Sequence, residues 1–105
     1  MAHEERSLRC EVVTWVSQDF PGWLRVRMAD ADGQSWFFVD KVPVFTDGQL
    51  NADTRLPAPV RVRCSIVGQD EDGALVISTQ PDGVEAEDGQ TLFRVRGDQL
   101  DRHTV

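Results

Sequence analysis

The chain has 105 residues, a net charge of −7 and a hydrophobic fraction of 40%. This length suits one domain with a single core, and the composition is that of an ordinary globular protein. The negative charge repels polyanions, so double-stranded nucleic acid and anionic membranes are disfavoured as partners. The first residues are polar, and no apolar run reaches the length of a membrane-spanning helix. These features predict a cytoplasmic protein without a signal peptide.

Six β-strands are predicted, separated by turns rich in Asp and Gly. Apolar residues that alternate or run continuously mark these strands at 8–16, 23–29, 35–41, 60–67, 74–79 and 91–96. The proline-bearing segment between the third and fourth strands has room for one helical turn at 50–56. We expect a single domain over 1–105, with flexible termini at about 1–6 and 99–105.

This order of elements predicts an all-β fold, namely one small OB-like barrel, closed or partly open, of about six antiparallel strands. At most one short helical turn lies between the third and fourth strands. In an OB-like order the first strand lies between the second and the fourth; other small barrels with the same number of strands, and the exact strand order, stay open. Cys10 and Cys64 both fall in apolar sets and are predicted core residues. A disulfide between them stays open if their strands are neighbours.

The residues that carry chemistry do not predict an enzyme. His3 and His103 lie in the predicted termini, so no internal histidine can activate a Ser or Cys nucleophile. The Asp-x-Asp-Gly segments at 30–33 and 70–73 lack the spaced glutamate of a calcium loop and are interpreted as hairpin turns. No Cys/His cluster has the spacing of a zinc site, so neither a metal nor a cofactor is predicted.

An aromatic turn and two acidic loops form the first candidate binding surface. Phe20 and Trp23 are predicted at a loop tip, where exposed aromatic residues anchor interfaces. The favoured alternative folds Phe20 back to plug the end of the barrel, because large apolar residues are usually buried. The loop residues that would meet a basic protein partner are Asp70, Glu71, Asp72, Glu85, Glu87 and Asp88.

Three Arg-Val-Arg tripeptides, at 25–27, 61–63 and 94–96, supply the second candidate surface. Successive side chains of a strand point to opposite faces, so each pair of arginines lies on one face with its valine on the other. The residues expected to gather there and bind single-stranded nucleic acid or an anionic ligand are Arg25, Arg27, Arg61, Arg63 and Trp15. The favoured alternative is a solvated outer face, on which Glu11 and loop carboxylates are the counter-ions.

Three segments resemble small uncharacterised actinobacterial proteins: 19–23 (Asp-Phe-Pro-Gly-Trp), 30–33 (Asp-Ala-Asp-Gly) and 36–46 (Trp-Phe-Phe-Val-Asp-Lys-Val-Pro-Val-Phe-Thr). The resemblance covers most of the chain but implies no activity and no site residues. Some small acidic proteins of such genomes are immunity proteins that neutralise a toxin. We therefore expect a non-enzymatic module that binds a protein partner, with an immunity or inhibitor role as one form of it. The choice between monomer and homodimer stays open.

Overall fold

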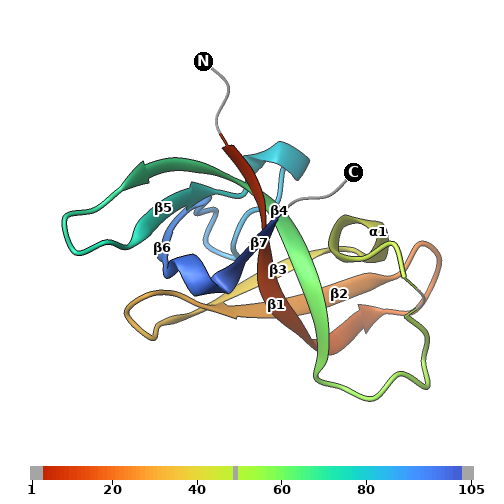
Figure 1. The fold of residues 1–105 in the computed structure, drawn as a ribbon. Helices are drawn as coiled ribbons and strands as arrows, with labels where there is room; N and C mark the ends of the chain where they lie inside the picture. Colours follow the sequence, from red (N-terminus) through yellow and green to blue (C-terminus); the bar gives the residue numbers. More distant parts are fainter. Residues whose placement is uncertain (1–3, 49, 103–105) are drawn as a thin grey trace.

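The computed structural model describes residues 4–48 and 50–102, in which antiparallel strands form one sheet that curls into a half-barrel (Figure 1). The strands are β1 (Glu4–Ser17), β2 (Trp23–Ala29), β3 (Ser35–Lys41), β4 (Ala58–Gln69), β5 (Leu75–Ser78), β6 (Leu92–Val95) and β7 (Leu100–Arg102). A short helix, α1 (Val42–Phe45), follows β3, and the 3₁₀ turns η1 (Gln80–Asp82) and η2 (Gly97–Gln99) flank β6. Within these residues, no helix has the length and apolar character needed to span a membrane.

β1 is the central strand of the sheet, whose order is β3-β2-β1-β4-β5-β6, with β7 also paired to β1. The predicted place of the first strand, between the second and the fourth, is confirmed. β1 is long enough to hold three neighbours. One edge pairs with β4, while the other pairs first with β7 and then with β2. The fold is therefore the small all-β barrel that the element order predicts.

One face of each central strand is buried, as the alternating pattern predicts. These buried residues are Leu8, Cys10, Val12, Leu24, Val26, Met28, Val60, Val62 and Cys64. Phe93 of β6 joins this core, where its ring packs edge-to-face on Trp36 (centroids 5.2 Å apart) and on Phe38 (5.6 Å). Because β3 and β6 end the strand order, these contacts draw the two ends of the sheet together.

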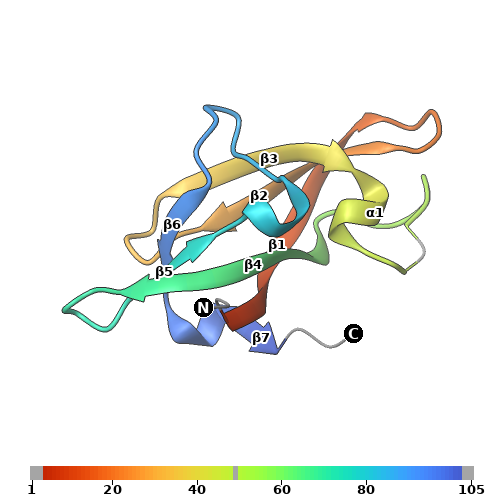
Figure 2. The ribbon, with the colours of Figure 1, turned by 90° about the horizontal axis from the view of Figure 1, so that it is seen from above.

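Backbone contacts also link the two ends of the half-barrel. Ala86, in the segment before β6, forms a bridge with Phe38, and the Glu87 N–H donates to the Phe37 carbonyl (2.9 Å). The Ala31 N–H, in the β2–β3 turn, donates to the carbonyl of Arg94 (2.8 Å). Figure 2 shows the segment before β6, in blue, alongside β3. The open side of the sheet is thus closed by a loop rather than by a strand ladder.

A β-bulge in β1 changes the face on which its last residues lie. The β1–β2 register skips one residue between Val12 and Thr14, so Val13 is an extra residue of β1. The predicted alternation, which placed Trp15 among the arginines, fails beyond this point. Trp15 instead packs against the core, and Val16 is 55% exposed.

The helical turn between the third and fourth strands lies earlier than predicted. It occupies Val42–Phe45, with Pro43 in its first turn, where the fixed φ of proline suits the start of a helix. The segment 50–56 is irregular, and Asn51 accepts the backbone N–H of Thr54 (3.0 Å) in a turn. The strands near the two ends of the chain also extend further than predicted.

Residues expected in the flexible termini lie in strands: Glu4–Arg6 begins β1, and Leu100–Arg102 forms β7. Arg6 pairs with Arg102 across these two strands. Residues 1–3 and 103–105, with His3 and His103, lie outside the described part of the chain.

Cys10 and Cys64 are buried free thiols on adjacent strands. In the β1–β4 register Cys10 faces Val60, whereas Cys64 faces Arg6, four residues away along β1. At about 3.3 Å per residue, roughly 13 Å separates the two positions, which is too far for a disulfide. The core prediction is confirmed. Burial raises the pKa of Cys64 to about 12 and also raises that of Cys10, so both stay thiols at neutral pH.

Candidate interaction site

The turn between β1 and β2 projects an uncovered aromatic side chain. Phe20 is 99% exposed, so the favoured prediction of a buried plug is wrong and the loop-tip alternative is confirmed. The Gly22 N–H closes the turn by donating to the Asp19 carbonyl (2.7 Å). Gly22 has a φ of +86°, and a Cβ at this position would lie 3.0 Å from Val42 Cγ2. Only glycine allows the turn to approach α1 so closely.

A hollow of about 340 Å³ lies beside Phe20. Its walls come from the end of β1, from the turn, from α1 and from the segment after α1. The lining residues are Trp15, Gln18, Phe20, Pro21, Gly22, Val42, Leu50, Asn51 and Ala52. Most of this lining is apolar, while Gln18 and Asn51 add amide groups. The Nε1–H of Trp15 is buried and has no acceptor within the described chain.

Trp23, the second predicted anchor, is half-buried at the start of β2. It pairs across the sheet with Lys41, whose ammonium lies 5.9 Å from the centre of the indole ring. This is the geometry of a cation–π contact. Trp23 is therefore partly covered by its own chain, whereas Phe20 is fully exposed.

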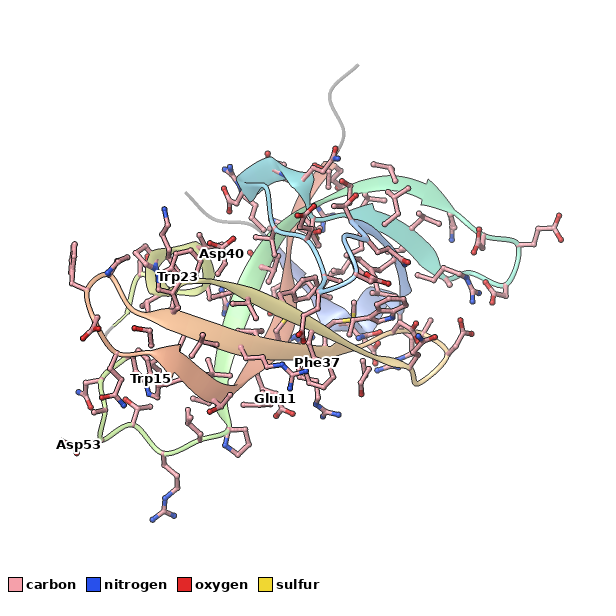
Figure 3. All side chains as sticks on the ribbon, turned by 180° about the vertical axis from the view of Figure 1, so that it is seen from behind. Glu11, Trp15, Trp23, Phe37, Asp40 and Asp53 are labelled. Carbon is pink, nitrogen blue, oxygen red and sulfur yellow. The ribbon has the colours of Figure 1, made fainter. Side chains whose placement is uncertain are left out.

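The end of the molecule around Phe20 carries more acidic than basic groups. We call residues 17–22, 40–48 and 50–57 the Phe20 end; they include Asp19, Asp40, Asp47 and Asp53 against Lys41 and Arg55. None of the four carboxylates forms an ion pair with any described residue. In Figure 3 the labelled Trp15, Trp23, Asp40 and Asp53 lie together at this end.

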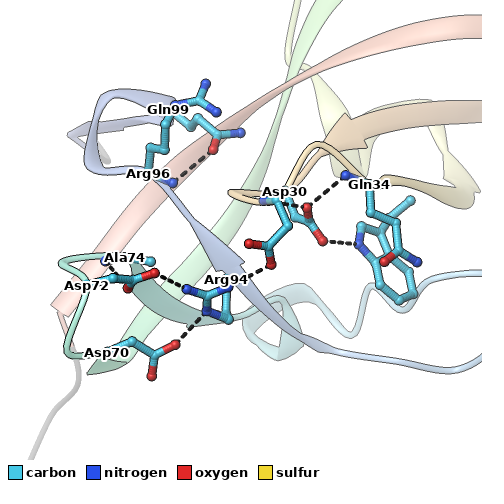
Figure 4. Close-up of polar contacts among 10 residues, drawn as sticks. Asp30, Gln34, Asp70, Asp72, Ala74, Arg94, Arg96 and Gln99 are labelled. Atoms are coloured by element: carbon cyan, nitrogen blue, oxygen red, sulfur yellow. Dashed lines mark hydrogen bonds and ion pairs between the residues drawn. The ribbon is translucent and has the colours of Figure 1, made fainter.

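The opposite end is organised around Arg94, on β6 (Figure 4). Its guanidinium reaches Asp32 in the β2–β3 turn (2.6 Å), Asp70 in the β4–β5 turn (2.6 Å) and Asp72 in the same turn. We call Arg94 with the turns 30–34 and 70–73 the Arg94 end. Two of the predicted partner-binding residues, Asp70 and Asp72, are therefore ion-paired with Arg94, while Glu71 is exposed and has no ion pair with a described residue.

Hydrogen bonds fix the ionised carboxylates of the Arg94 end. The Ala74 N–H and then Arg94 lower the pKa of Asp72. Burial would raise the pKa of Asp30, but donors prevail and lower it: the Trp36 Nε1–H (2.9 Å) and the backbone N–H groups of Asp32 and Gln34 (each 2.9 Å). Asp30 thus ties the turn to β3 and is a structural residue.

The acidic loop before β6 is partly neutralised. Glu87 pairs with Arg25 (2.7 Å), whose guanidinium also lies 3.9 Å from the centre of the Phe37 ring. Asp88 accepts the Gln90 N–H (3.0 Å), and Glu85 is exposed. Of the three loop residues predicted to bind a partner, one is engaged with an arginine of the same chain.

The arginine surface is mostly neutralised by its own carboxylates. Arg27 pairs with Glu11 (2.8 Å) and Arg63 with Asp82 (2.8 Å), which are counter-ions of the kind predicted. With Arg25 on Glu87 and Trp15 turned to the core, no continuous Arg/Trp strip is assembled from these residues. Arg61 is the exception, because it forms no ion pair with any residue of the described chain.

Two features of these surfaces could not be predicted from patterns in the sequence. The partners of Arg94 lie 22 to 62 positions away along the chain, and no local spacing marks them. The hollow beside Phe20 combines segments on both sides of β2 and β3. In the described residues, no group of three or more His, Cys, Asp or Glu side chains could hold a metal ion.

Comparison with known proteins identifies no relative. No protein-family model matches the chain, and no curated protein sequence or solved structure is significantly similar to it.

Proposed function

We propose that the protein is a non-enzymatic binding module that docks onto another protein through its Phe20 end. The observation that supports this most is the side chain of Phe20, which is 99% exposed beside a largely apolar hollow. A single exposed apolar residue needs no explanation on its own. A fully exposed aromatic ring next to a hollow is different, because an aromatic anchor and a neighbouring pocket are the usual centre of a protein interface.

The charge of the Phe20 end favours a basic partner. Its four carboxylates outnumber its two cations, and these carboxylates have no ion pairs within the described chain. A segment that carries an apolar side chain flanked by Lys or Arg would fill the hollow and meet this charge. A second copy of the chain would bring the same negative excess, so self-association through this end is disfavoured. An immunity or inhibitor protein is one form that such a module takes.

The test is site-specific photo-cross-linking in cells of the source organism. p-Benzoylphenylalanine replaces Phe20 in one variant and Leu92 in the control; Leu92 is 51% exposed but lies on β6. We expect an adduct with a basic protein from position 20 alone. The adduct should weaken at high salt and in the variant Asp19→Asn/Asp53→Asn, because both changes reduce the charge attraction.

Three results would contradict the proposal. Equal adducts from both positions would mean that the cross-linker captures any neighbour. An adduct indifferent to salt and to the two Asn substitutions would remove the basic partner. A dimer of the chain itself would identify a second copy as the occupant.

A further inference from the structure

Two hollows, of about 350 and 480 Å³, adjoin where α1 ends beside β4. Both are lined by Phe45, Thr46, Asp47 and Arg61, so the Arg61 side chain lies where they meet. Together they have the size of a small-molecule site. They share no lining residue with the hollow beside Phe20.

Arg61 lies next to a second positive charge and has no counter-ion within the described chain. In the β1–β4 register it lies directly opposite Arg9, and like charges at such positions destabilise a sheet. Arg9 is compensated by Asp101 (3.1 Å) and donates to the Asp98 carbonyl. Arg61 has neither an ion pair nor a hydrogen bond in the described chain, although it is exposed and lines both hollows.

A third arginine adds positive charge to the same place. Arg63, two residues along β4, lines the first hollow and pairs with Asp82 (2.8 Å). Its Nε–H is buried and lacks an acceptor within the described residues. Arginine donors are therefore present in excess over their acceptors on this stretch of β4.

We propose that these two adjoining hollows, together called the double hollow, bind an oxyanion, which is the carboxylate or phosphate group of a small molecule. Arg61 is the main contact, and Arg9 lies beside it. A guanidinium presents a planar fork of N–H donors that matches either group. Phe45 and Val60 supply apolar wall for a carbon skeleton. A nucleic-acid strand would need a continuous basic track, but Arg25 and Arg27 are neutralised by their own carboxylates.

The negative charge of Asp47 should weaken the binding of an anion at Arg61. Asp47 lines both hollows and has no ion pair with a described residue, so its charge opposes a bare anion at Arg61. Replacing it by Asn removes that repulsion and leaves a side chain of similar shape. The site therefore predicts opposite changes in affinity for Arg61→Ala and Asp47→Asn.

The test is an NMR titration of the ¹⁵N-labelled protein at low ionic strength, with inorganic phosphate in one series and acetate in another. We expect saturable shifts of the amide signals of residues 45–47 and 60–61. Arg61→Ala should weaken the affinity about tenfold or more, since it removes charge-assisted hydrogen bonds. Asp47→Asn should tighten it. Whichever anion binds with the higher affinity, phosphate or acetate, indicates whether the ligand carries a phosphoryl or a carboxylate group.

Arg55→Ala is the matched control, because it removes the same charge from an exposed position outside both hollows. Equal weakening by Arg55→Ala would show general charge screening and overturn the proposal. The proposal would also be overturned if the shifts did not saturate with either anion, or if only a short oligothymidylate were bound. Phe20→Ala should leave the titration unchanged, so this site can stand or fall independently of the docking surface.

Discussion

The Arg94 end and the Phe20 end place similar residues in opposite situations. Both ends are acidic turns joined to an aromatic residue. At the Arg94 end, Asp32, Asp70 and Asp72 meet one guanidinium, and the ring of Phe93 is buried against Trp36 and Phe38. At the Phe20 end, the carboxylates are unpaired within the described chain and the ring of Phe20 is exposed.

On the proposed function, this difference separates groups used for folding from groups that remain available to a partner. The Arg94 contacts join the β2–β3 turn, the β4–β5 turn and β6, which closes the half-barrel. Nothing in the described chain covers Phe20, so the fold gains little from its side chain. The comparison can be tested by making equivalent substitutions at the two ends. They should have different effects on the stability of the fold.

The largest difference is expected between the two phenylalanines. Phe93→Ala removes a buried ring that is 3% exposed, and it should lower the free energy of unfolding by about 3–5 kcal/mol. Phe20→Ala should change it by no more than about 0.5 kcal/mol, because the ring is already in water. Urea denaturation of both variants measures the two values. A large loss of stability from Phe20→Ala would show that the ring has a folding role.

A smaller effect is expected from the turn that carries Phe20. Gly22→Ala forces a residue with a Cβ to adopt a φ of +86° and to contact Val42 at 3.0 Å. We expect a cost of about 1–3 kcal/mol. Gly73→Ala, at the Arg94 end, has a φ of +90°, but no atom of the described residues lies within 4 Å of the added Cβ. It should cost less, and the difference in unfolding free energy measures the close approach of the Phe20 turn to α1.

An equal cost at both glycines would mean that backbone strain alone decides the effect. The turn would then adjust without disturbing α1. In that case the hollow beside Phe20 would be less rigid than its lining residues indicate, and a docking surface there would lose part of its pre-organisation.

The positions of the strands along the chain could be predicted because the responsible signals are local, whereas their order in the sheet followed only from the expected OB-like arrangement. Alternation in β2 and β4, and the Asp/Gly turns between strands, place the strands without knowledge of distant contacts. The extra residue Val13 could not be foreseen, since a bulge depends on which residues of β2 lie opposite. That one residue decides that Trp15 faces the core rather than the arginines.

The two candidate sites were harder to predict for the same reason. Whether Phe20 is covered depends on how its turn packs on the rest of the chain, where Val42 and Trp15 lie against Gly22. Whether an acidic loop is free depends on arginines far away in the sequence, such as Arg94. The sequence patterns gave an exposed Phe20 only as the less favoured alternative, and only the tertiary contacts show which carboxylates remain unpaired in the described chain.

The smallest expected effect is the acid sensitivity of the Arg94 end. The pKa of Asp30 and that of Asp72 are lower in the folded chain, so folding favours the ionised carboxylates. The stability they provide is complete above the usual Asp pKa of about 3.9. It is lost as the pH falls through the lower folded pKa values. Urea midpoints measured from neutral pH to about pH 2 should therefore fall in the acid range.

Asp30→Asn tests the source of this loss. It removes the ionisable group that the Trp36 Nε1–H and two backbone N–H groups stabilise, so the midpoint should fall less steeply with acid than in the wild type. Asp53→Asn is the control at the Phe20 end, where the carboxylate has no ion pair within the described chain, and it should follow the wild-type curve. If Asp53→Asn flattened the curve as much as Asp30→Asn, acid sensitivity would reflect the net charge of −7 rather than the contacts of one end. The distinction between carboxylates held for folding and carboxylates free for a partner would then no longer hold.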